Sequence, residues 1–248
     1  MLLEELRDYN ATLLQTASFK DYCPNGVQVE GRPEVRRIAT AVTASQQALD
    51  EAIAWGADAI LVHHGYFWRN ENAAITGIKK RRIAQLLRND VSLLAYHLPL
   101  DAHPELGNNA QLGKLLGLEV QGRFGEQDIV CVGSLAQPQT LNQFAQQVAH
   151  GLQRKPQVIG DGARNIRRIA WCSGGAQGYF ELAIAQGVDA YLTGEISEQN
   201  YHLAQESGVA FIAAGHHATE RYGIQALGNH LGAQFALEHR YFESGNPV

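Results

Sequence analysis

The sequence predicts an α/β fold built from two similar lobes, and three observations support this prediction. Short apolar runs typical of buried strands alternate with segments whose apolar residues recur at helical spacing. Residues 36–64 recur 131 positions later as residues 167–195, and 12 of these 29 positions are identical. A further echo, at an offset of 119, places residues 94–101 on residues 213–220. An internally duplicated strand-helix-strand unit explains all three.

Length and composition restrict the class of protein. The 248 residues, 45% of them hydrophobic, can bury a substantial core. A formal charge of -5 and a pI near 6.0 argue against a surface devoted to nucleic acid. The three cysteines form no CxxC pair, which disfavours both a disulfide framework and a thiolate zinc site. The early acids, and the absence of an apolar run long enough to span a bilayer, indicate no targeting signal and no membrane segment. We therefore expect a cytoplasmic enzyme.

The elements of the first lobe follow from local signals. Ser45 is a good N-cap for the helix that follows it. Pro24-Asn25-Gly26 is a strong turn signal. The expected elements are a helix over 2–16, strands over 27–29 and 36–42, a helix over 46–55 and a strand over 59–62.

The second lobe begins after a segment without strong helical periodicity. We place the boundary near Gly122 to Gly125, which gives lobes 1–124 and 125–248, with a C-terminal segment that can pack back on the first lobe. Expected elements are a strand over 129–132, a helix over 141–152, a connection over 156–166 and a strand at the second RRIA.

Histidines and acids collect where the predicted strands end, which is where ligands bind in open α/β sheets. The duplication aligns His97 with His216 and Asp101 with Glu220, so each copy carries a His-x-x-x-acid pattern. If the segment after Gly215 is helical, this spacing brings imidazole and carboxylate to one face. In the first copy, Pro99 favours an extended or turn conformation at Leu98 instead.

The adjacent His63 and His64 end the predicted strand over 59–62 and complete the candidate set. Such a nitrogen and oxygen donor set suits zinc, manganese, iron or nickel. It is also larger than one catalytic zinc normally uses, so a site for two divalent ions in the cleft between the lobes follows. Taken alone, each of these histidine and acid motifs can also be an ordinary polar surface or a packed part of the core.

The ordered motifs of the chain resemble those of the Nif-three-like family, two-lobed α/β proteins often labelled GTP cyclohydrolase I type 2 homologs. The motifs, which cover nearly the whole chain, are CPNGVQVEG, VTAS, GADAILVHHGYFW, HLPLDAHPELGNNAQL, TGEISEQ and GHHATER. Cys23 stands where a small residue is expected. The insert that some members carry between the lobes is absent, so the chain resembles the short form.

The resemblance implies a specific ligand set. His64 and Asp101 would hold one metal ion, His63 and His216 the other, and Glu220 would bridge them. It also implies a ring-shaped homohexamer with the metal sites facing an internal cavity.

Other residues near these motifs are candidates for catalysis or substrate binding. His97 is either a ligand or a hydrogen-bonding neighbour, and Glu195, the counterpart of His64, is a candidate acid or base or a partner of a ligand. The candidates for contacting a substrate are the rings of Tyr66 and Tyr96, His217, and the backbone amides of Gly174 and Gly175. Simple packing and a plain tight turn are the alternatives.

These features favour a dinuclear metal-dependent hydrolase that acts on a nucleotide-like small molecule through metal-activated water. The family label would have that water open the imidazole ring of GTP. Two alternatives stay open: a metal-dependent phosphoesterase acting on nucleic acid or damaged nucleotides, and a non-catalytic metal-binding scaffold or regulator.

Overall fold

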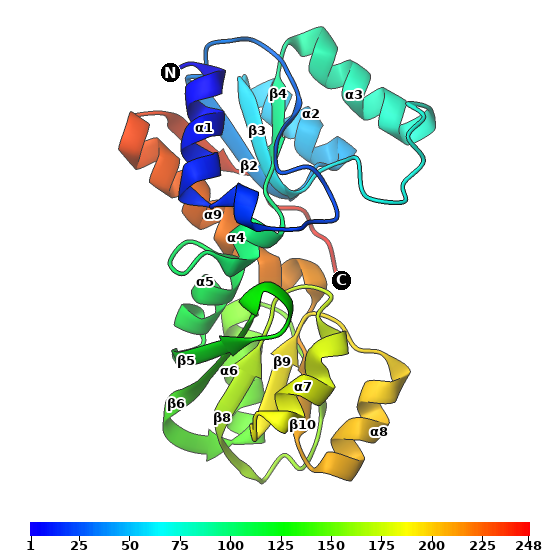
Figure 1. Cartoon of the computed structure of the whole chain (residues 1–248), viewed down its shortest axis with the longest axis vertical. Helices are drawn as coiled ribbons and strands as arrows, with labels where there is room; N and C mark the ends of the chain where they lie inside the picture. The colour runs from blue at the N-terminus through cyan, green and yellow to red at the C-terminus, as the bar shows by residue number, and fades with distance from the viewer. The chain divides into compact units, whose positions relative to one another are not determined.

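Two separate β-sheets organise the chain (Figure 1). The computed structural model describes residues 1–248 and divides into two units. Unit 1 consists of residues 1–107 and 223–245, and unit 2 of residues 108–222 and 246–248. The boundary that we expect at 124/125 differs from this division because the strand over 118–124 pairs with the next strand of unit 2. None of the helices has the length and apolarity that crossing a membrane requires.

Unit 1 is a three-layer α/β structure. Its sheet has the order β1-β4-β3-β2-β11, in which β1 is antiparallel to β4 and the other neighbours are parallel. The final strand, β11, comes from the C-terminal part of the chain. The elements are α1 (Leu3–Leu13), η1 (Thr16–Ser18), β1 (Gly26–Val29), β2 (Arg37–Thr43), α2 (Gln46–Trp55), β3 (Ala59–His64), α3 (Gly77–Asn89), β4 (Ser92–Ala95), α4 (Leu98–Ala102) and β11 (Glu238–Tyr241). Helix α9 (His216–Phe235) begins in unit 2 and continues in unit 1 from residue 223.

Successive side chains of β3 point to opposite faces of the sheet and so contribute to both hydrophobic cores of unit 1. Ile60 and Val62 pack against α2 and α3 on one face of the sheet. Ala59 and Leu61 pack against α1 and α9 on the other. A strand buried on both faces reads as a continuous apolar run, which is why this segment lacks polar alternation.

Unit 2 has a six-stranded sheet in the order β5-β6-β8-β9-β10-β7, with parallel pairing only among β8, β9 and β10. Its elements are α5 (Asn108–Leu115), β5 (Leu118–Phe124), η2 (Glu126–Asp128), β6 (Val130–Thr140), α6 (Leu141–Leu152), β7 (Gln157–Ile159), β8 (Asn165–Trp171), η3 (Gln177–Tyr179), α7 (Phe180–Ala185), β9 (Ala190–Thr193), α8 (Glu198–Ser207) and β10 (Ala210–Ala213).

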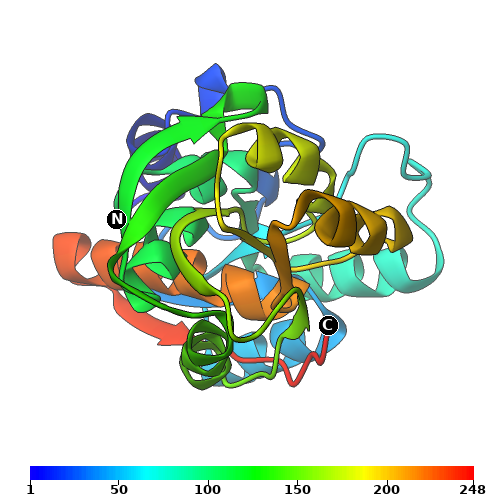
Figure 2. The ribbon, with the colours of Figure 1, turned by 90° about the horizontal axis from the view of Figure 1, so that it is seen from below.

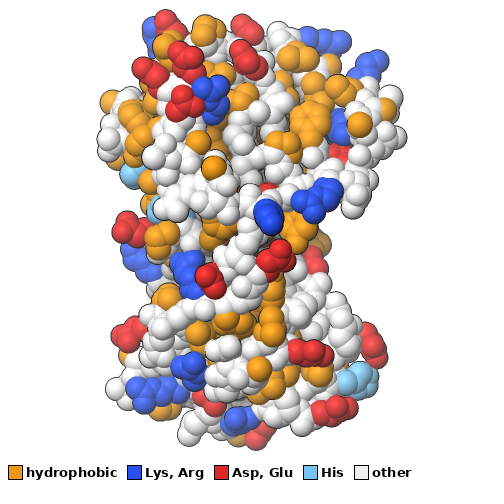
Figure 3. Space-filling view, in the orientation of Figure 1, with side chains coloured by type: hydrophobic (Ala, Val, Ile, Leu, Met, Phe, Trp, Pro, Cys, Tyr) orange, Lys and Arg blue, Asp and Glu red, His pale blue; other side chains and the backbone are white.

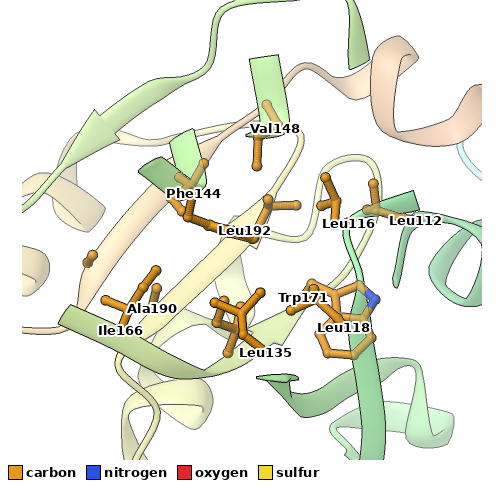
Figure 4. Close-up of a cluster of buried hydrophobic side chains, with 14 of the residues drawn as sticks. Leu112, Leu116, Leu118, Leu135, Phe144, Val148, Ile166, Trp171, Ala190 and Leu192 are labelled. Atoms are coloured by element: carbon orange, nitrogen blue, oxygen red, sulfur yellow. The ribbon is translucent and has the colours of Figure 1, made fainter. Parts of the chain in front are cut away.

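The core of unit 2 lies largely on one face of this sheet. Phe144 and Val148 of α6 pack toward Leu192 of β9, beside the fully buried Trp171 (Figure 4). On the opposite face, the ring of Phe180 lies 4.9 Å from that of Phe211. Helix α6 and the pair α7 and α8 therefore cover different sides of the sheet, as the view in Figure 2 shows.

Most predicted elements agree with the structure, but β7 lies within the connection expected over 156–166, and the strand expected over 129–132 is the longer β6. The helices over 46–55 and 141–152 are confirmed at both ends, and the Ser45 side chain accepts the amide of Ala48 as a cap. The strand expected over 59–62 continues to His64. On the face seen in Figure 3, acidic and basic side chains are interspersed, in keeping with a modest net charge.

The same backbone pattern recurs in the two units. Ile38 pairs with Ala59 in unit 1, and their counterparts 131 positions later, Ile169 and Ala190, pair in unit 2. Asp58 accepts the amides of residues 36 and 37 at 2.8 and 2.9 Å. Its counterpart, Asp189, accepts those of residues 167 and 168, both at 2.9 Å. This recurrence supports the predicted duplication, which stays a prediction.

Candidate metal centre

His63 lies at the end of the central strand of unit 1 and is completely buried. Its Nδ1 is 2.9 Å from the carbonyl oxygen of Tyr96. A carbonyl only accepts, so Nδ1 carries the proton and Nε2 presents its lone pair. That Nε2 lies 3.5 Å from Oδ1 of Asp101, whose side chain is 7% exposed. The pair is arranged as two ligands of one cation would be.

His64 and His97 extend this group. The Nδ1 of His64 hydrogen-bonds with the Thr43 hydroxyl at 3.2 Å, which leaves Nε2 as the candidate ligand atom. The Nδ1 of His97 donates to Oδ1 of Asp21 at 2.7 Å. A nitrogen from each of His63, His64 and His97 lies within 4.8 Å of the others. Unit 1 thus gathers three imidazoles around one point.

Asp21 is the residue of this group that sequence reasoning missed. Its buried carboxylate also accepts the amide of Leu98 at 2.9 Å and the Asn25 side chain at 2.8 Å. Burial alone would raise the pKa of Asp21, but the hydrogen bond and charge of His97 hold it below the ordinary value. The signal available in the sequence was an acid four residues before Asn25 in the predicted turn.

Asp101 is presented by a short helix, and this corrects one expectation. The sequence predicts an extended or turn conformation at Leu98 because of Pro99, but α4 starts at Leu98 with His97 as its N-cap residue. Proline is tolerated in the first turn of a helix because the amide it lacks would have no intrahelical partner there. Because α4 starts directly after His97 and includes Asp101, these two residues lie one helical turn apart. We expect this arrangement only in the second copy.

The second group of candidate ligands belongs to unit 2, and its helix confirms the helical spacing expected there. Helix α9 starts at His216, whose Nε2 lies 3.2 Å from Oε2 of Glu220 one turn later. The Nδ1 of His216 donates to Oε1 of Glu195 at 2.7 Å. The predicted acid, Glu195, thus orients the imidazole, and its other oxygen accepts from Gln177.

Two carboxylates change the acidity of His216. Burial alone would lower the pKa of His216, but hydrogen bonds and charge from Glu220 and Glu195 raise it to about 9. Without a metal ion, the imidazole therefore holds a proton between two acids at neutral pH. A proton and a divalent cation compete for such a position.

Gly174 makes room for the Glu220 carboxylate. It follows β8, has a left-handed φ of +66°, and a Cβ there would lie 2.1 Å from Oε1 of Glu220. Its amide donates to Thr219 at 2.9 Å, one residue before that carboxylate. Only glycine fits this backbone conformation and this approach without strain.

The donor atoms fit a divalent metal. Two ligand atoms bound to one ion at about 2.1 Å lie roughly 3.0–3.4 Å apart at the usual coordination angles. The His216 to Glu220 distance of 3.2 Å falls in this range, and the His63 to Asp101 distance of 3.5 Å lies just above it. Imidazole and carboxylate donors without thiolate suit a borderline or fairly hard ion.

Comparisons with known proteins identify the family of the chain. The family model described as Duf34/NIF3 (NGG1p interacting factor 3) matches residues 1–247. The chain belongs to the Duf34/NIF3 family. It is 58% identical over 250 residues to a Pseudomonas aeruginosa protein named GTP cyclohydrolase 1 type 2 homolog, covering all of this chain and 97% of that one.

Solved structures of the Duf34/NIF3 superfamily share its fold. The protein ybgI, described as being of unknown function, superposes with a TM-score of 0.97 at 48% identity over the full length of both chains. TTHA1606 from Thermus thermophilus superposes with a TM-score of 0.92 at 32% identity, again over both full lengths.

Two aromatic candidates of this Duf34/NIF3 chain lie in the core instead of facing a ligand. The ring of Tyr96 is fully buried, and Tyr66 is 6% exposed with its hydroxyl donating to the carbonyl of Ala44. Burial raises the pKa of both phenols. The half-buried aromatic ring beside the histidines is that of Trp68, 4.9 Å from the ring of His97.

Of the remaining substrate-binding candidates, Gly174 uses its amide within the protein, and Gly175 and His217 stay predictions. The amides of Ser173, Gly174 and Ala176 donate to side chains of unit 2, which leaves Gly175 as the donor of this turn for a phosphate. His217 is 5% exposed, and its backbone amide donates to the Val248 oxygen at 2.9 Å.

Proposed function

We propose that this Duf34/NIF3 protein is a hydrolase that depends on two divalent metal ions and acts on a nucleotide-like small molecule. One observation carries the proposal: the four candidate histidines each have Nδ1 engaged by a protein oxygen. The partners are Tyr96 O, Thr43 Oγ1, Asp21 Oδ1 and Glu195 Oε1. Metal-binding histidines characteristically use one nitrogen in this way, because the hydrogen bond fixes the tautomer and the ring orientation.

The proposed protein ligands are His63, His64, Asp101, His216 and Glu220, with Glu220 as the bridging carboxylate. Their support is chemical. His63 and His216 each have a carboxylate oxygen at the spacing of two ligands that share an ion. The zinc, manganese, iron and nickel ions all accept such donors.

Bound divalent ions would supply a water acidified toward neutral pH for attack on a carbon or phosphorus centre. The residues of the chain itself orient and hold protons. Glu195 fixes the His216 ring through Nδ1, and Asp21 does the same for His97. We propose these two contacts as the means by which His97 and Glu195 contribute, in place of direct proton transfer.

A nucleotide-like substrate is supported by the name that the relatives carry, GTP cyclohydrolase 1 type 2 homolog, and by the half-buried Trp68 ring beside His97. A planar base can stack on such a ring. We also propose a homohexamer, as the resemblance implies, and a cytoplasmic location, as the cysteine pattern suggests. Light scattering of the purified chain tests the assembly.

The decisive experiment measures bound metal by mass spectrometry in wild type and in Glu220→Ala, together with turnover of a nucleotide panel in Mn, Fe and Zn. Glu198→Ala is the matched control, because Glu198 also pairs with a histidine four residues away, at 3.0 Å, but is 85% exposed. We expect two ions per chain and a turnover, both lost in Glu220→Ala and both kept in Glu198→Ala.

Two other outcomes decide between alternatives. Two ions without any turnover would favour the scaffold function and overturn the hydrolase. Absence of metal after reconstitution of the wild type would overturn the metal centre itself.

A further inference from the structure

A small open pocket lies in unit 2 where β9 and β10 end. Its volume is about 240 Å³, and its lining includes Arg154, Gln157, Glu195 and Ala213. Pockets that enclose a whole drug-sized ligand are larger, roughly 300–1,000 Å³. The carboxyl ends of parallel strands are where ligands bind in α/β sheets. This pocket therefore suits one end of a ligand whose remainder lies outside it.

Arg154 is the only cationic side chain of this lining, and its position is built into the fold. Its Nε donates to the Pro247 carbonyl at 3.2 Å, and Nη1 lies 3.5 Å from the Lys155 carbonyl. Gly215 provides the space beneath it: a Cβ at this residue would lie 2.5 Å from Nε, and its φ is +100°. Glycine at 215 and the two carbonyls hold the guanidinium at the pocket wall.

Arg154 shares its pocket with acidic groups but makes no ion pair with any of them. No carboxylate oxygen lies within 4.0 Å of its nitrogens, whereas Arg164 of the same unit has Asp189 at 3.6 Å. Glu195 and Val248, the last residue of the chain, are the lining residues that carry a carboxylate, and Glu195 is engaged through Oε1 with His216 and through Oε2 with Gln177. A guanidinium has five N–H donors, so three remain after the two carbonyl contacts.

We propose that Arg154, with the side-chain amide of Gln157, forms a subsite for the phosphate group of the substrate. A guanidinium presents a planar fork that matches phosphate oxygens, and charge-assisted bonds of this kind are about twice as strong as neutral ones. The subsite places that phosphate beside Glu195, which holds His216. This inference rests on the proposed hydrolase and narrows its substrate class to phosphorylated compounds, at the expense of free bases and nucleosides.

The test measures binding of inorganic phosphate and pyrophosphate to full-length, chelator-treated protein by isothermal titration calorimetry. Because the metal ions have been removed, any phosphate that binds is held by the protein and not by a metal ion. The variant is Arg154→Gln, and Arg167→Gln is the control, since Arg167 is an exposed arginine of the same unit outside the pocket. We expect at least tenfold weaker binding in Arg154→Gln and less than twofold change in Arg167→Gln.

A second variant, Arg154→Lys, keeps the charge without the fork and should bind with intermediate affinity. Pyrophosphate binding that is equal in wild type, Arg154→Gln and Arg154→Lys would overturn the subsite, as would the absence of millimolar binding in wild type. Failure of the hydrolase is detected separately, by the metal content of Glu220→Ala. Either proposal can therefore fail while the other stands.

Discussion

Replacing Gly174 by alanine probes the contact on which the Glu220 carboxylate depends. The added Cβ would lie 2.1 Å from Oε1 of Glu220 and 3.2 Å from Nε2 of His216. Gly187 is a matched control, because its φ of +67° is close to the +66° of Gly174 while nothing lies within 4 Å of its added Cβ. Both substitutions place an alanine in a left-handed backbone conformation, but only Gly174→Ala brings its Cβ against the Glu220 carboxylate.

The magnitudes separate the two effects. A left-handed alanine costs about 1–2 kcal/mol. Alanine also restricts the unfolded chain more than glycine does, which offsets this cost by about 0.4–1 kcal/mol. Gly187→Ala should therefore destabilise the protein by roughly 1 kcal/mol. In Gly174→Ala the clashing atom ends a flexible side chain, so the carboxylate can swing aside, and the extra cost lies near 1 kcal/mol, roughly the low end for overpacking.

The larger effect of Gly174→Ala should fall on metal binding. The carboxylate must move by at least about 1.3 Å, from 2.1 Å to the 3.4 Å at which ordinary van der Waals contact begins. A metal ligand displaced this far should lower affinity by about tenfold or more, as loss of ligand orientation does. Urea unfolding of the chelated variants measures stability, and competition with a chromogenic chelator measures affinity. Equal metal affinity in Gly174→Ala and Gly187→Ala would refute the proposed role of Glu220 as a ligand.

Three further predictions follow from hydrogen bonds and burial of single side chains. Glu195→Gln should weaken metal binding about 10- to 100-fold in a chelator competition, because it weakens the hold on the His216 ring. Asp58→Asn should lower stability against urea by about 1.5–3 kcal/mol, and Asp189→Asn by less, since the side chains are 12% and 32% exposed. Burial lowers the pKa of His239, so the unfolded chain takes up the proton first, and stability should fall as pH drops below about 7.5. His239→Gln should reduce that slope, which is at most about 1.4 kcal/mol per pH unit, and an unchanged slope would exclude this histidine as its source.

Local signals in the sequence predict most of the fold. Helices over 46–55 and 141–152 are marked by caps and periodicity that depend only on neighbouring residues. The division of the units is harder to predict, because the segment over 118–124 is assigned by a pairing with β6 that no local pattern of β5 specifies. The pairing of the C-terminal strand β11 with β2 likewise joins residues about 200 positions apart, which no local pattern specifies.

The candidate ligands could be found because they collect where strands end, and Glu195 could be found because the duplication aligns it with His64, but the other residues that orient the histidines could not. Asp21 lies 76 positions from His97, in a loop with no repeat to mark it. Tyr96 contributes a backbone carbonyl to His63, and any residue type could provide it. The sequence reveals the role of a residue only where that role requires a particular side chain. This explains why the sequence leaves both substrate stacking and simple packing open for Tyr96, which the structure places in the core.

The two units reach the same arrangement around their counterpart histidines by different routes. His97 and His216 occupy equivalent positions of the predicted duplication, and each donates Nδ1 to a carboxylate at 2.7 Å. In unit 1 that carboxylate is Asp21, from the loop before β1. In unit 2 it is Glu195, at the position that His64 occupies in unit 1. Because unit 2 has an orienting acid where unit 1 has a candidate ligand, unit 1 needs its acid from elsewhere in the chain. An imidazole held by a carboxylate is thus the feature that both units keep while the residue that supplies it changes, which is the behaviour expected when orientation of the ring is what function requires.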